Sequence, residues 1–145
     1  MIDQKVTLVQ TNIQAAKEHL ADIQTEMDIL EQAGIFPALP HFQWQDRGSD
    51  GRYLYLIFRQ NGDGSHTGPD GKKKVYIGAN QDKIEEAKRL VKNREMWEEL
   101  QFQKTDLTRW IRMCESKLLT LQRDADSLLK FSNEFPKVKL AKQAA

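Results

Sequence analysis

Residues 2–30 read IDQKVTLVQTNIQAAKEHLADIQTEMDIL, and their apolar side chains recur in alternating steps of four and three. That spacing places them along one side of an α-helix, in the heptad pattern of a coiled coil. Gly34 suits the left-handed position that follows a helix, and Pro37 and Pro40 oppose continuation. We predict a helix that ends near Ala33, with this apolar seam: Ile2, Val6, Val9, Ile13, Ala16, Leu20, Ile23, Met27 and Leu30.

A second heptad pattern runs through the C-terminal part of the chain. Asn80 is a good N-cap residue, and Asp82 places a negative charge in the first turn, where the helix dipole favours it. Pro136 is expected to end this helix. We therefore predict a long helix over residues 81–135 and a short basic tail over residues 136–145, with Lys137, Lys139 and Lys142. The seam of this helix comprises Leu107, Ile111, Cys114, Leu118, Leu121, Ala125 and Leu128.

Three segments between the helices have the composition of β-strands. HFQWQDR, RYLYLIFRQ and KKKVYIG, which begin at residues 41, 52 and 72, are rich in aromatic and β-branched residues and are bounded by turn residues. They predict a three-stranded antiparallel meander. The expected fold is mainly α with a small β insert (α+β), an antiparallel coiled-coil helical hairpin with the meander at one end. Its parts are a first helix (1–34), a β head (35–80), a second helix (81–135) and the tail (136–145).

Alternation along these strands sorts their side chains onto two faces. One face is apolar and can be covered by Ile84, Ala87 and Val91 of the following helix. Its members are Phe42, Trp44, Leu54, Leu56, Phe58, Val75 and Ile77.

The other face carries all three tyrosines of the chain among cationic and amide side chains. Cations can neutralise phosphates, and flat rings can stack on bases, so this composition suits nucleic acid. An ordinary solvated sheet face and a contact with a second copy remain alternative interpretations. The candidate nucleic-acid-binding residues are Arg47, Tyr53, Tyr55, Arg59, Lys72, Lys74 and Tyr76; Gln43, Gln45 and Ile57 share their face.

Residues 41–94 resemble known DNA-binding modules. The pattern W-x7-R-Y-L-Y-L-I-F-R, followed by K-K-K-V-Y-I-G and I-E-E-A-K, resembles the three-stranded module of AP2-type factors and the arm domains of phage-type integrases. The resemblance implies that the sheet enters the major groove with the helix behind it. The order coil, G-R-Y-L-Y-L hairpin and V-K-N is also similar to uncharacterised bacterial proteins linked with mobile elements, although their cysteine-rich turn is missing here.

The charge distribution and the lack of known motifs favour a binding protein over an enzyme or a metal-binding protein. The net charge is +1, but residues 41–94 carry eleven Lys or Arg against seven Asp or Glu. The lone Cys114 and the three histidines have no metal-ligand spacing, and the glycine-rich loop from Asn61 to Gly71 fits neither a Walker A nor a calcium loop. We expect no enzyme, no metal, no cofactor and no small-molecule substrate. The start MIDQKVTLVQ is unlike a signal peptide, and no apolar run suits a membrane, so we expect a cytoplasmic protein.

The helices also carry apolar residues away from their seams, and one hairpin seam cannot bury two stripes. These residues predict a homodimer or a helical protein partner. Two functional hypotheses follow, a non-enzymatic DNA-associated protein with a coiled coil for dimerisation, and a coiled-coil adaptor or structural protein without a nucleic-acid role. The predicted oligomer interface comprises Leu8, Ile29, Trp110, Met113, Leu119 and Leu129.

Overall fold

The computed structural model describes the backbone of residues 2–144 and the side chains of residues 3–49 and 51–133. Over residues 2–144 the fold is α+β, as predicted, with two α-helices and one three-stranded antiparallel sheet. The chain divides into two compact units: unit 1 holds residues 1–21 and 105–145, and unit 2 holds residues 22–104. The main elements are α1 (Ile2–Ala33), β1 (His41–Asp46), β2 (Arg52–Ile57), β3 (Lys74–Gly78) and α2 (Gln81–Ala144).

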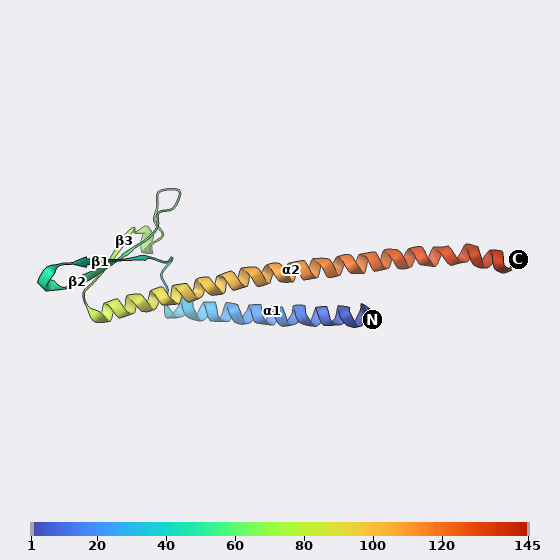
Figure 1. Cartoon of the computed structure of the whole chain (residues 1–145), viewed down its shortest axis with the longest axis horizontal. Helices are drawn as coiled ribbons and strands as arrows, with labels where there is room; N and C mark the ends of the chain where they lie inside the picture. The colour runs from blue at the N-terminus through green and yellow to red at the C-terminus, as the bar shows by residue number, and fades with distance from the viewer. Residues whose placement is uncertain (1, 145) are drawn as a thin grey trace. The chain divides into compact units, whose positions relative to one another are not determined.

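The sheet in unit 2 has the strand order β1-β2-β3, and both pairings are antiparallel (Figure 1). The predicted meander is therefore confirmed. A short 3-10 turn, Gly48–Asp50, joins the first two strands, and a second one, Pro69–Gly71, precedes β3. Between Leu54 and Tyr55 the register against β3 shifts, because Gly78 pairs with Leu54 while Tyr76 pairs with Tyr55. This bulge places one extra residue in β3 and bends the strand.

The core of unit 2 lies between one face of the sheet and the first turns of α2. Leu54 and Leu56 are fully buried, and Ile84, Ala87 and Val91 of α2 are buried in the same cluster. All seven residues predicted for the apolar face belong to this cluster, which confirms the assignment of faces. The cluster also includes Phe36, Ala38 and Leu90, which the strand pattern did not reveal.

The helix ends in unit 2 follow the residue types that the sequence provides. The side chain of Asn80 accepts hydrogen bonds from the backbone N–H groups of Asp82 and Lys83, at 2.9 and 3.2 Å. α1 ends at Ala33, and the N–H of Gly34, with a φ of +105°, donates to the carbonyl of Leu30 at 3.0 Å. Both predicted boundaries are therefore confirmed, because each depends on a local backbone conformation that one residue favours.

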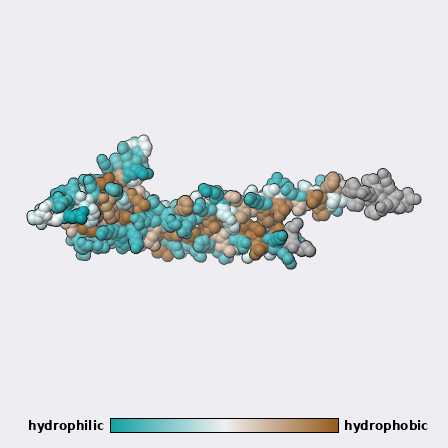
Figure 2. Space-filling model, in the orientation of Figure 1, coloured by the Kyte–Doolittle hydropathy of each residue, from teal (hydrophilic) through white to brown (hydrophobic). Residues whose placement is uncertain are grey.

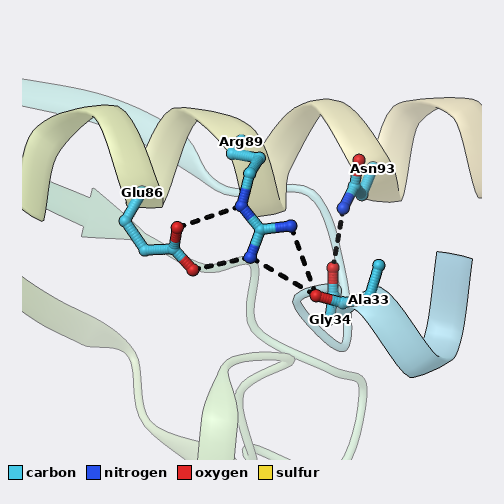
Figure 3. Close-up of polar contacts among 5 residues, drawn as sticks. All are labelled: Ala33, Gly34, Glu86, Arg89 and Asn93. Carbon is cyan, nitrogen blue, oxygen red and sulfur yellow. Dashed lines mark hydrogen bonds and ion pairs between the residues drawn. The ribbon is translucent and has the colours of Figure 1, made fainter.

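A polar contact joins α2 to the C-terminal end of α1 (Figure 3). The Arg89 guanidinium donates two 3.3 Å hydrogen bonds to the carbonyl of Ala33 and two shorter ones to the Glu86 carboxylate. Asn93 donates to the carbonyl of Gly34 at 3.0 Å. The hydrogen bonds from Arg89 lower the pKa of Glu86 and raise that of Arg89. A cation thus meets the last carbonyl of α1, which has no partner within its own helix, and a neutral amide donates to the carbonyl that follows it.

Further contacts between α1 and α2 occur inside each unit. In unit 2, Trp97 donates to Glu31 at 2.9 Å and Lys104 donates to Gln24 at 2.6 Å. The later residue of α2 contacts the earlier residue of α1, so the two helices are antiparallel within unit 2. In unit 1, Lys17 and Glu115 form an ion pair at 3.4 Å. Ile13, Ile23, Met27 and Ile111 of the predicted seams are buried.

Two predictions about α2 are wrong. The helix does not end before Pro136 but continues to Ala144. A proline inside a helix removes one hydrogen bond, and its ring clashes with the carbonyl four residues earlier, which can kink a helix without ending it. The distal seam is not buried either. Every described residue from Leu119 to Asn133 is exposed, including Leu121, Ala125 and Leu128, because the described packing of α2 in unit 1 ends at Leu118. The side chains of Ile2 and of the predicted basic tail lie outside those described.

No stretch of the described helices combines the length and the hydrophobicity that a membrane span requires.

Candidate nucleic-acid interface

The face of the sheet opposite the core brings the three tyrosines together. Tyr55 lies at the centre of the sheet, between Gln43 of β1 and Tyr76 of β3, and Tyr53 pairs with Gln45. Strand alternation alone therefore places these side chains on one surface.

The tyrosine rings contact one another across β2 and β3. The Tyr76 ring centroid lies 5.1 Å from that of Tyr55 and 6.2 Å from that of Tyr53, the second pair being stacked. Gly78 has a φ of +96°, and a Cβ at that position would lie 3.2 Å from the Tyr76 hydroxyl oxygen. A glycine at the bulge therefore leaves the space that the Tyr76 ring occupies.

Two cations lie against these rings. The Arg47 guanidinium carbon is 5.0 Å from the centroid of the Tyr53 ring, and Arg47 also donates to the Tyr55 hydroxyl at 3.1 Å and to Gln45 at 3.3 Å. The Lys74 ammonium lies 4.2 Å from the Tyr55 centroid. Cation–π attraction fixes both cations beside the rings. We call Arg47, Tyr53, Tyr55, Lys74 and Tyr76 the tyrosine cluster.

The outer members of the tyrosine cluster are accessible. Tyr76 is 58% exposed, and Arg47 and Lys74 are exposed as well, whereas Tyr53 and Tyr55 are half-buried. The cluster thus presents one open ring with a cation on each neighbouring tyrosine. This arrangement can offer a stacking surface and hydrogen-bond donors to the same ligand.

Five of the seven predicted nucleic-acid-binding residues contact one another, and they form the tyrosine cluster. Arg59 and Lys72 are exposed but lie outside the tyrosine cluster, Arg59 two residues after β2 and Lys72 two residues before β3. The chain between them forms a hydrogen-bonded extension of the hairpin, in which Thr67 donates its N–H to the carbonyl of Arg59 at 2.9 Å. At its tip the Ser65 hydroxyl and N–H donate to Asp63, which lowers the pKa of that carboxyl.

Sequence reasoning missed three features of this region. It did not identify Gln45 as a partner of Arg47, nor the bulge that places Gly78 beneath Tyr76. It also missed a cavity of about 680 Å³ beside Arg59, which is lined by residues of four separate segments. Gly78 was the available signal, because a glycine at the end of an aromatic strand indicates a bulge or a close approach.

The predicted oligomer residues are exposed, with values between 42% for Trp110 and 63% for Leu119. On α2, further exposed apolar surface comes from Leu121, Leu128 and Phe131. Figure 2 shows apolar side chains on α2 just before the grey C-terminal residues.

Among the residues that the structure describes, no group of three His, Cys, Asp or Glu side chains could hold a metal ion. Cys114 is a free, half-buried thiol on α2. Comparison of the chain with protein-family models, curated proteins and solved structures finds no match, so the resemblance to DNA-binding modules stays an expectation based on residues 41–94.

Proposed function

We propose that the tyrosine cluster binds nucleic acid and that exposed apolar residues of α2 pair two copies of the chain as a coiled coil. The observation that supports nucleic-acid binding is the placement of Arg47 and Lys74 on the faces of Tyr53 and Tyr55, beside the open ring of Tyr76. Cations held in this way need little reordering to meet a phosphate, and the open ring can stack on a base.

The proposed binding predicts a salt-dependent affinity that the cluster residues control. Fluorescence anisotropy of labelled duplex and single-stranded oligonucleotides, measured across a salt series, is the test. Lys74→Gln is expected to make the plot of log K against log salt less steep, by the amount that one phosphate contact contributes, because one phosphate is no longer neutralised. Tyr76→Leu is expected to cost about 1–3 kcal/mol of binding, because a base loses its stacking partner.

Lys88→Gln is the matched control, because Lys88 is an exposed cation of unit 2 on α2 rather than on the sheet. Its affinity and salt slope should equal those of the parent chain. If no oligonucleotide binds even at low salt, or if Lys88→Gln has the same effect as Lys74→Gln, the proposal fails. The alternative function, an adaptor that works through its helices, would then be favoured.

Dimerisation is supported by the fifteen-residue segment Leu119–Asn133, in which all residues are exposed although several are large and apolar. A helix that keeps such residues in water gains free energy when a second helix covers them. We expect the double variant Leu119→Gln and Leu129→Gln to weaken self-association at least about 1000-fold, since four leucine side chains of a dimer lose their burial.

Sedimentation equilibrium of the full chain measures this association. Gln122→Ala, an exposed polar position in the same segment, is the control and should leave the dissociation constant unchanged. A parent chain that stays monomeric at high micromolar concentration would contradict the dimer, and the apolar segment would then be assigned to a different helical protein.

A further inference from the structure

A cavity of about 680 Å³ lies in unit 2, where β1 begins and β2 has just ended. Its volume is within the usual range for sites that hold a small organic group. Leu39, Ile57 and Phe58 contribute apolar walls, and Arg59, Thr67 and Glu98 contribute polar groups. The residues that line the cavity thus combine apolar side chains with an arginine, a threonine and a glutamate.

Thr67 provides an independent sign that a polar ligand belongs there. Its Oγ1 is buried and has no hydrogen-bond partner, and it is the only such side-chain nitrogen or oxygen atom among residues 3–49 and 51–133. A buried hydroxyl without a partner costs free energy. Thr67 also lines the cavity, so the unpaired hydroxyl and the cavity occur at the same residue.

The charged groups of the cavity are held in different ways. The Glu98 carboxylate accepts a hydrogen bond from Arg94 at 3.1 Å, and the Arg94 side chain is only 16% exposed and lies over the Trp97 ring at 4.4 Å. Glu98 is therefore fixed by a largely buried cation. Arg59 is exposed, and its position follows from the hydrogen bond between its carbonyl and the N–H of Thr67. The ligand meets one fixed acceptor and one adaptable donor.

The cavity lies at the end of β2, and residues from both faces of the sheet line it, because Phe58 belongs to the core face whereas its neighbours Ile57 and Arg59 do not. Ile57 and Arg59 follow Tyr53 and Tyr55 at steps of two, so strand alternation directs all four side chains to the same face. Four residues of extended chain from Tyr55 to Arg59 span roughly 13 Å, which is about the length of four stacked nucleotides of one strand. A single strand that stacks on Tyr76 or Tyr55 is therefore long enough, over four nucleotides, to extend to Arg59 at the edge of the cavity.

We propose that the cavity accepts one unpaired guanine base of a single strand that lies on the tyrosine cluster. Guanine offers two acceptors, O6 and N7, to a guanidinium, and its amino group offers a donor to a carboxylate. Arg59 and Glu98 provide this complementary pair, and Thr67 supplies a third polar contact. Bases in duplex DNA are stacked and cannot enter such a cavity without leaving the helix. The inference rests on the proposed function, because it deepens the assignment of the same face.

Titration of the full chain with each of the four ribonucleoside 5′-monophosphates, followed by amide NMR spectra, tests the cavity separately from the tyrosine cluster. We expect GMP to shift the amide signals of Arg59, Thr67 and Glu98 and to bind at least fivefold more tightly than the other three. Thr67→Val and Glu98→Gln are each expected to weaken GMP binding at least fivefold. Thr67→Val keeps the side-chain shape and removes an unpaired hydroxyl, so it should raise the melting temperature while it weakens binding.

Thr11→Val makes the same change at an exposed residue of α1, far along the chain from the cavity residues. It is the control and should not alter GMP affinity. Equal binding of all four nucleotides, or no shift at Thr67 and Glu98, would overturn the guanine site. If oligonucleotides bind in a salt-dependent manner while GMP leaves these amides unmoved, the proposed function stands and the cavity inference fails. If GMP binds in the cavity but no oligonucleotide binds, base recognition is supported and the proposed function fails.

Discussion

Replacement of Phe58 by alanine is expected to lower the free energy of unfolding by about 3–5 kcal/mol, the range for a large aromatic residue removed from a packed core. Phe58 is 2% exposed, and its ring meets that of Phe36 edge-on with the centroids 5.8 Å apart. The ring also fills the space beside Gly68. The Phe58 N–H donates to the carbonyl of Lys73 at 2.7 Å, so a movement of this backbone into the vacated volume would cost that hydrogen bond.

Urea titration followed by the NMR signals of β2 amides measures this loss within unit 2. Phe42→Ala is the matched control, because Phe42 lies on the same face of the sheet but is only partly buried on the edge strand β1. We expect a smaller loss at Phe42 than at Phe58. A loss below about 1 kcal/mol for Phe58→Ala would contradict its place at the centre of the core.

Gly68→Ala is expected to be nearly as disruptive, although it adds a single methyl group. A Cβ at Gly68 would lie 2.1 Å from the carbonyl oxygen of Lys72 and within 2.9 Å of two carbon atoms of the Phe58 ring. The clash with a backbone atom cannot be relieved by a rotamer change, so the hairpin extension must move. We expect a loss of roughly 3 kcal/mol, at the upper end of overpacking effects, in the same urea titration.

Gly62→Ala separates this clash from the general effect of replacing a loop glycine. A Cβ at Gly62 would have no atom within 4 Å, and the residue belongs to the same hairpin extension. Its stability should stay within about 0.5 kcal/mol of the parent chain, as for surface positions without special contacts. Equal stabilities for the Gly68 and Gly62 variants would show that the extension does not pack on Phe58.

The features that could be predicted from sequence are those that one residue or a short period determines. Asn80 and Gly34 define helix ends because each favours a specific local backbone geometry. The two-residue period of RYLYLI separates Leu54 and Leu56 from Tyr53 and Tyr55 in the structure as it does in the sequence.

The features that could not be predicted depend on contacts between distant segments. The shifted pairing of Leu54 with Gly78 belongs to two strands at once, so neither strand reveals it alone. The cavity at Thr67 needs Leu39, Phe58 and Glu98 to meet in space. The heptad pattern through Leu128 predicts burial, but a pattern shows only which side of a helix is apolar and not whether anything covers it.

The contact between Arg89 and the end of α1 has a consequence for biosynthesis. Arg89 follows the carbonyl that it binds by 56 residues, and Asn93 follows its own partner by 59. At a synthesis rate of roughly 5–20 residues per second, the ribosome adds Arg89 about 3–11 s after it has added Ala33, the last residue of α1. During that interval the apolar side of α1, with Ile23 and Met27, has no native partner from this chain. The nascent chain is therefore most exposed to aggregation and to chaperone binding before the sheet and the start of α2 have emerged from the ribosome.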